Sequence, residues 1–233
     1  MRVCQRLDSI IMNTHNQRPD SCRAPLVCYV TDRTAFGLDE TEAVARLLEA
    51  IGRAADAGVD AIQLREKDLS GRALLELAEA AVGRSGTAKI LINDRLDVAL
   101  AAGAAGVHLG GESVPVADVA AFRAAGRAPA HFMIGRSCHS IEEALQAERD
   151  GADYVFFGPV FATPSKSRFG PPQGVDALAA VCCRVRIPVL AIGGITLQNA
   201  VECITAGAAG VAAIRLFQES KDLGALVRAL KQR

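Results

Sequence analysis

Short apolar runs alternate eight times with longer helix-forming stretches after residue 24 of this sequence. The longer stretches are rich in Ala, Leu and Glu, and their apolar residues recur at spacings of three and four, as in amphipathic helices. Eight such units predict a single (β/α)8 TIM barrel, in which closure of the parallel sheet removes every sheet edge. The predicted strands span residues 26–31, 61–65, 90–93, 106–109, 133–137, 154–158, 189–192 and 210–214. The clearest predicted helices span residues 40–55, 71–82, 116–125, 140–149, 178–185 and 197–206.

The chain has 233 residues, of which 50% are hydrophobic, and this suits one barrel domain. We assign residues 25–233 to a TIM-barrel catalytic domain. Residues 1–24 mix charged, amide and proline residues around one short apolar patch, which predicts a flexible N-terminal tail rather than an export signal. The seven cysteines show no metal-binding spacing and are read as free thiols, which predicts a cytoplasmic protein.

Charge and aromatic content argue against two classes of partner. The 26 basic residues balance the 26 acidic ones, so the chain lacks the basic footprint of a nucleic-acid-binding protein. Aromatic residues make up only 4% of the chain, which also argues against base stacking. The apolar runs are too short to cross a membrane. The sequence leaves a homo-oligomer open.

Four predicted helices end in a glycine followed by small residues. These glycines are Gly58, Gly103, Gly151 and Gly207. A glycine that takes positive φ can stop a helix and let the chain turn back tightly. We therefore assign these turns to the bottom of the barrel and expect the functional site at the opposite, carboxyl ends of the strands.

Two cations follow the second predicted strand. Arg65 and Lys67 are two residues apart, so both can face the barrel mouth, where they would suit a phosphate group. A salt bridge with Glu66 or another neighbour is the alternative. After the third strand, Asn93 and Asp94 offer the oxygen ligands that Mg²⁺ prefers, although Asp94 could equally cap the helix that follows.

The loop after the sixth strand supplies further phosphate-binding groups. Thr163 and Ser165 can donate hydroxyl hydrogens and Lys166 can neutralise phosphate charge, but the same residue types are common in surface loops. Gly193 and Gly194 expose backbone N–H groups after the seventh strand, where phosphate sites of this fold are often built.

Two other reactive residue types are interpreted as structural. Cys138 has no readable cause for a lowered thiol pKa, so a packed cysteine is favoured over a nucleophile. His108 has no carboxylate partner that the sequence reveals, which favours a packed or hydrogen-bonded core histidine.

Together these segments resemble the thiamine phosphate synthase family and its close relative, the thiazole tautomerase, over nearly all of residues 25–230. The motifs are Tyr-Val-Thr-Asp-Arg at 29–33, Gln-Leu-Arg-Glu-Lys at 63–67, Ile-Asn-Asp-Arg at 92–95, Gly-Val-His-Leu-Gly at 106–110, Gly-Pro-Val-Phe at 158–161 with Thr163 and Lys166, and Ala-Ile-Gly-Gly-Ile-Thr at 191–196.

The resemblance implies a transferase that joins hydroxymethylpyrimidine diphosphate to a thiazole phosphate, giving thiamine phosphate and pyrophosphate, with Mg²⁺ as cofactor. The partners it implies are small phosphorylated substrates. The implied catalytic residues are Arg65, Lys67, Ser137 and Lys166, and the implied metal ligands are Asp94 and Glu112. The implied substrate-binding residues are Gln63, Leu64, Arg65, Glu66, Lys67, Asn93, Ser137, Thr163, Pro164, Ser165, Lys166, Gly194, Ile214 and Arg215.

Three positions depart from the family pattern. Ser113 stands where the family usually has a second Mg²⁺ aspartate, so Glu112 or water would have to substitute for it. Arg215 stands where a small hydroxyl residue is usual. Pro159 stands where the tautomerase branch is expected to use a histidine, which argues against that chemistry. A tautomerase-like enzyme and a non-catalytic thiazole phosphate binder remain the alternatives; a Schiff-base aldolase is disfavoured, because Lys166 follows the strand on a loop.

Overall fold

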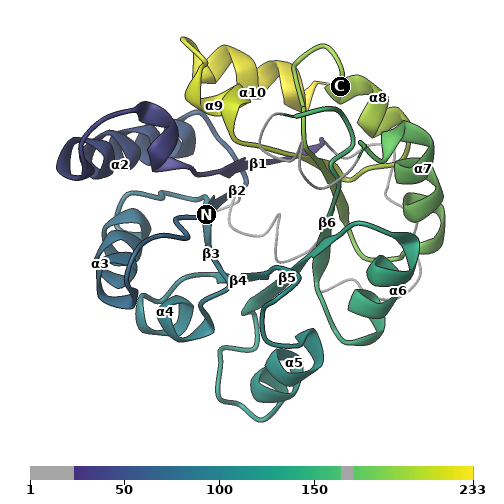
Figure 1. The fold of residues 1–233 in the computed structure, drawn as a ribbon, viewed down its shortest axis with the longest axis horizontal. Helices are drawn as coiled ribbons and strands as arrows, with labels where there is room; N and C mark the ends of the chain where they lie inside the picture. The colour runs from purple at the N-terminus through teal and green to yellow at the C-terminus, as the bar shows by residue number, and fades with distance from the viewer. Residues whose placement is uncertain (1–23, 164–170, 233) are drawn as a thin grey trace.

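Eight parallel strands close into a barrel in chain order, with the helices around its outside (Figure 1). The computed structural model describes residues 24–163 and 171–232. The (β/α)8 TIM barrel predicted from the sequence is confirmed, and the strand ends differ from the prediction by no more than one residue. The strands are β1 (Leu26–Val30), β2 (Ala61–Leu64), β3 (Lys89–Asn93), β4 (Gly106–Leu109), β5 (Met133–Cys138), β6 (Tyr154–Phe157), β7 (Val189–Ile192) and β8 (Gly210–Ala213).

Several helices begin where a serine or aspartate side chain accepts a hydrogen bond from a first-turn backbone N–H, the usual N-cap arrangement. Asp39, Ser70, Ser140 and Asp222 do this for α2, α3, α6 and α10. The helical elements are η1 (Arg33–Phe36), α2 (Glu40–Asp56), α3 (Gly71–Val82), α4 (Leu96–Ala101), α5 (Val116–Ala124), α6 (Ile141–Arg149), α7 (Gly174–Arg184), α8 (Ala200–Thr205), α9 (Arg215–Gln218) and α10 (Leu223–Lys231). Within the described residues, no helix combines the length and hydropathy that a membrane span requires.

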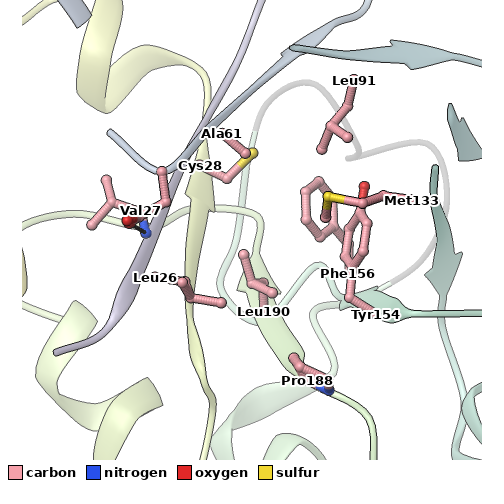
Figure 2. A pocket seen from close by; sticks show the side chains of 11 residues that line it. Leu26, Val27, Cys28, Ala61, Leu91, Met133, Tyr154, Phe156, Pro188 and Leu190 are labelled. Atoms are coloured by element: carbon pink, nitrogen blue, oxygen red, sulfur yellow. Dashed lines mark hydrogen bonds between the residues drawn. The ribbon is translucent and has the colours of Figure 1, made fainter. Parts of the chain in front are cut away.

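The core has two layers because the strands are covered on both faces. One layer lies between the sheet and the helices and includes Ile62 and Leu64. The other fills the inside of the barrel and includes Cys28, Leu91 and Phe156. An apolar pocket of about 30 Å³ lies at the amino-terminal end of this layer, lined among others by Leu26, Ala61 and Pro188. Figure 2 shows the rings of Phe156 and Tyr154 on one side of this space and aliphatic side chains across from them.

The predicted bottom turns are confirmed. Gly58, Gly103, Gly151 and Gly207 have φ values of 88°, 64°, 93° and 98°, in the left-handed region that favours glycine. The helices are therefore joined to the amino-terminal ends of the strands that follow by tight turns, and the longer loops lie at the carboxyl ends, where sites of this fold are built. Residues 1–23, which make up nearly all of the predicted tail, lie outside the described residues.

Gly135 makes room for an aromatic ring inside the barrel. A Cβ atom at this position would lie 2.1 Å from Cζ of Tyr154, a side chain that is itself buried. We expect Gly135→Ala to lower the free energy of unfolding by about 1–3 kcal/mol, because neither the ring nor the strand has space to move. Chemical denaturation monitored by circular dichroism measures this.

Gly52→Ala is the matched control, since Gly52 lies in α2 and a Cβ there would have no atom within 4 Å. This substitution should stabilise the protein by about 0.5–1 kcal/mol, the usual gain from replacing a helical glycine. Equal unfolding midpoints for the two variants would contradict the packing role of Gly135.

Candidate functional site

A hydrogen-bonded row of amide and carboxylate groups lies at the carboxyl ends of β2 and β3. Gln63 Nε2 donates to Asn93 Oδ1 at 2.8 Å, and Asn93 Nδ2 donates to Asp94 Oδ2 at 2.6 Å. Gln63 is buried, while Asn93 and Asp94 are half-buried. Each side chain is therefore held by its neighbour in the row. The buried end of the row is Gln63, and the more accessible end is Asp94.

Asp94 has a left-handed backbone, with φ of 62°, which is uncommon for a residue other than glycine. Its N–H donates to the His108 carbonyl at 2.9 Å, and its Oδ1 accepts from Gly110 N at 2.9 Å and from the Ser113 hydroxyl. Burial raises the pKa of this carboxyl, but the bonds from Ser113 and Gly110 and the charge of Lys67 outweigh it and lower the pKa overall. Asp94 is thus a carboxylate at neutral pH.

Asp94 does not cap the helix that follows, so the alternative reading of this residue is wrong. The N-cap of α4 is Arg95, and its side chain makes no capping hydrogen bond. The Asp94 carboxylate instead turns toward the loop after β4, where Gly110 and Ser113 hold it.

The donor set around Asp94 fits a magnesium ion that takes most of its ligands from water and substrate. Mg²⁺ commonly binds one or two carboxylates and completes its shell in this way. Asp94 supplies one anionic group, with the Ser113 hydroxyl beside it. Glu112 is exposed. Among residues 24–163 and 171–232, no group of three or more His, Cys, Asp or Glu side chains could hold a metal ion.

Glu66 lies between Arg65 and Lys67 in the sequence, and its carboxylate is held by Thr31 and Arg33. Its Oε1 accepts from the Thr31 hydroxyl at 2.5 Å, and its Oε2 lies 3.2 Å from Nη1 of Arg33. The Thr31 hydroxyl oxygen also accepts from Arg65 N at 3.0 Å. Glu66 is therefore buried against Thr31 and Arg33, whereas Arg65 is half-buried and Lys67 is exposed in the turn that follows the strand.

Arg33, the first residue of η1, anchors this segment. The guanidinium contacts the carboxylates of Asp68 at 2.7 Å and Glu40 at 2.8 Å as well as Glu66, although Arg33 is only 3% exposed. The hydrogen bond to Asp68 raises the pKa of Arg33 most; burial acts against it, and Glu40 and Glu66 add to the increase. The alternative reading of Arg65 and Lys67, a salt bridge with Glu66, is not what the described residues show, since Glu66 pairs with Arg33.

His108 lies buried inside the barrel between two hydroxyl groups. Its Nδ1 is 3.0 Å from the Tyr154 hydroxyl oxygen, and its Nε2 is 2.9 Å from Ser137 Oγ. Burial lowers the pKa of His108 to about 3, so the ring is neutral at physiological pH. The prediction of a hydrogen-bonded core histidine is confirmed.

The loops after β6 and β7 pack together on the opposite side of the mouth. Val160 N donates to the Ile192 carbonyl at 2.9 Å, and Phe161 N donates to the Gly193 carbonyl at 3.0 Å. A Cβ on Gly194 would lie 2.6 Å from the Ala162 carbonyl oxygen, so only glycine permits this approach. The half-buried Thr163 follows directly. Pro164, Ser165 and Lys166 lie outside the described residues.

Other predicted residues occupy different surroundings. Ile214 lies at the top of the barrel's inner layer, and Arg215 is exposed at the start of α9. Leu64 points into the layer between sheet and helices, so its side chain does not face the mouth. Cys138 is buried, and burial raises its pKa to about 12, which confirms a packed thiol.

Charges from separate strands meet around His108. Asp94, Arg136 and Arg65 all act electrostatically on its ring, and Lys67 acts on Asp94. The structure therefore places Arg65 and Asp94 within electrostatic range of the ring that contacts Ser137 Oγ, and Lys67 within range of Asp94. The sequence assigned no role in the site to Arg136, whose guanidinium donates to the Gly110 carbonyl. Its neighbours Gly135 and Ser137 on β5 face the barrel interior, so strand alternation predicts that the Arg136 side chain faces outward. Its position near the site follows only from its contact with the loop after β4.

The motif resemblance extends to known proteins. The thiamine monophosphate synthase family model matches residues 27–217. The thiamine-phosphate synthase of Chlorobium luteolum is 40% identical over 213 residues, which cover 91% of this chain and 93% of that protein. The thiamine-phosphate synthase of Methanoculleus marisnigri is 43% identical over 88% of this chain and 92% of its own length.

A solved structure agrees with the sequence relatives. Thiamine phosphate pyrophosphorylase from Pyrococcus furiosus superposes with a TM-score of 0.73 at 33% sequence identity, over 89% of this chain and 94% of that one. The match of one family model to most of the barrel and the identity to full-length relatives lead to the same conclusion. The chain belongs to the thiamine monophosphate synthase family.

Proposed function

We propose that this chain is a thiamine phosphate synthase, a transferase that couples hydroxymethylpyrimidine diphosphate to a thiazole phosphate. Family membership and extensive identity to named synthases support this activity. The structural observation that carries the proposal is the row from Gln63 through Asn93 to ionised Asp94, on the same mouth as Arg65, Lys67 and Ser137. Amide groups can form hydrogen bonds with the polar edge of a pyrimidine ring, and cationic groups can pair with the diphosphate that the ring carries. The carboxylate can hold a metal ion between them.

The reaction exchanges one bond to carbon for another. The bond between the pyrimidine's methylene carbon and the diphosphate oxygen breaks, and that oxygen keeps the electron pair. The thiazole nitrogen supplies the pair for the new carbon–nitrogen bond. Negative charge grows on the leaving oxygens, so preorganised cations accelerate the reaction without a protein nucleophile. Arg65 and Lys67 are the described cations placed to do this; Lys166 keeps this role as a prediction from the sequence.

Asp94 is the residue that would hold Mg²⁺, with Ser113 beside it. When bound, the ion would neutralise part of the diphosphate charge. Ser113 also donates to Asp94, which keeps the carboxylate turned toward the mouth. Glu112 as a second ligand, the binding of the thiazole phosphate near Thr163 and Gly194, and a cytoplasmic location remain part of the proposal.

Purified protein given both substrates and Mg²⁺ should form thiamine phosphate and pyrophosphate in equal amounts. Conversion to fluorescent thiochrome and a pyrophosphate assay measure the two products. Absence of both products with well-folded protein would end the synthase proposal. Turnover of a single thiazole substrate would instead select the tautomerase-like alternative, and thiazole phosphate binding without any product would select the binder.

Arg65→Ala should lower kcat by about 100-fold or more, the usual effect of removing one preorganised group that stabilises developing charge. Its melting temperature should stay near that of the unchanged protein, because Arg65 is half-buried and Glu66 retains its contacts with Arg33. The control is Arg72→Ala, on the exposed face of α3, which should leave kcat unchanged. Parallel losses of activity and stability in Arg65→Ala would show a structural role.

Mg²⁺ should tighten pyrophosphate binding in a way that depends on Asp94. Isothermal titration calorimetry with pyrophosphate, with and without Mg²⁺, measures this gain. Asp94→Asn should remove most of it, because the amide carries no charge for the ion. Asp97→Asn, which changes a nearby exposed aspartate, should retain it. Full retention in Asp94→Asn would exclude Asp94 as a ligand, and an equal loss in Glu112→Gln would identify the second one.

A further inference from the structure

We propose that Tyr154 and His108 form a relay that fixes the direction of the Ser137 hydroxyl, so that its hydrogen is presented to the substrate's phosphate oxygens. Ser137 would then act only as a donor at the mouth. His108 and Tyr154 are positioning residues in this scheme, because they act through Ser137. The identity of the acceptor rests on the proposed function, whereas the direction of the relay rests on the hydrogen bonds alone.

Strand register builds the relay across three neighbouring strands. His108 on β4 pairs with Gly135 on β5, and Gly135 pairs with Tyr154 on β6. A Cβ on Gly135 would lie 2.2 Å from the Tyr154 hydroxyl oxygen, so the missing side chain leaves the path on which histidine and tyrosine meet. Ser137 lies two residues farther along β5 and reaches the other ring nitrogen.

Aromatic packing holds the imidazole ring in this plane. The Phe156 ring centroid lies 4.3 Å from that of His108, with the planes tilted by 36°. His108 is 1% exposed and Tyr154 is 4% exposed. Both rings are therefore enclosed, and their polar atoms must find partners within the protein, since an unpaired buried group is costly.

The Tyr154 hydrogen selects the histidine tautomer. Burial raises the pKa of Tyr154 well above its ordinary value, so the phenol stays protonated. Within the described part of the chain, His108 Nδ1 is the acceptor that lies within reach of this hydroxyl. If Nδ1 carried a hydrogen, the phenol hydrogen would have no acceptor in an apolar interior. Tyr154 therefore donates to Nδ1, and the hydrogen of the neutral ring is on Nε2.

The tautomer then decides what Ser137 can do. Nε2–H donates to Ser137 Oγ, so the serine oxygen is used as an acceptor and its own hydrogen is directed elsewhere. An anion at the mouth is the partner that this hydrogen suits. With the opposite tautomer, the Ser137 hydroxyl would donate its hydrogen to Nε2. Only the lone pairs of the serine oxygen would then face the mouth, and these repel a phosphate oxygen.

Nitrogen NMR tests the relay without any substrate. Long-range proton–nitrogen correlation spectra of the full chain at neutral pH should show His108 with a protonated Nε2 and an unprotonated Nδ1. His108→Gln, which loses one ring signal, assigns the resonance. An Nδ1–H tautomer would overturn the proposal. Because no turnover is required, this result stands apart from the test of synthase activity.

A double-mutant cycle tests the action through Ser137. Tyr154→Phe should lower kcat/KM for the pyrimidine diphosphate about tenfold, the usual effect of weakening a hydrogen bond to a charged group. In the Ser137→Ala background the same change should have almost no further effect. Additive losses would show that Tyr154 acts by another route and would overturn the proposal.

Tyr29→Phe and His108→Gln complete the design. Tyr29 is the other tyrosine of the chain, buried in the outer core layer, so Tyr29→Phe should leave kcat/KM unchanged. His108→Gln keeps an N–H donor that can reach Ser137 and should retain more activity than His108→Leu, which has none. Equal activity of the two His108 variants would contradict the donor role of Nε2.

Discussion

Closure of the parallel sheet is the constraint on which the rest of this molecule depends. Helices cover the outside of the barrel and apolar side chains fill its amino-terminal half, so polar side chains from the strands can collect only toward the carboxyl ends. The cations of the β2 exit, the carboxylate of the β3 exit and the hydroxyl of β5 are far apart in the sequence. They meet because every strand runs in the same direction.

The polar groups inside the mouth satisfy one another rather than standing alone. Gln63, Asn93 and Asp94 are joined by hydrogen bonds, as are Tyr154, His108 and Ser137. Such bonds remove the penalty of burying polar groups and hold each side chain in one orientation. A reaction that stabilises growing negative charge benefits from this rigidity, because groups that are already oriented need no reorganisation.

The sequence was sufficient for features that depend on local pattern. The alternation of strand-like and helix-like segments predicted the barrel. The glycines at helix ends predicted tight turns, and two of them, Gly58 and Gly151, have φ values near 90°. The contacts of Arg33 were not predictable, because Glu66 and Asp68 lie 33 and 35 residues away and no local signal joins them. The left-handed backbone of Asp94 was missed for a similar reason, since Gly110, which holds the carboxylate, belongs to the next loop.

The buried contacts of Glu66 limit how the segment of residues 65–67 can evolve. Arg33 and Thr31 hold the Glu66 carboxylate, while Arg65 and Lys67 on either side of it in the sequence are more accessible. A one-residue insertion or deletion just before Glu66 would move the carboxylate out of this place and leave the buried guanidinium of Arg33 without that partner. Substitutions of Arg65 or Lys67 can therefore adjust the charge of this segment gradually, whereas a change in its length would break a buried ion pair in one step.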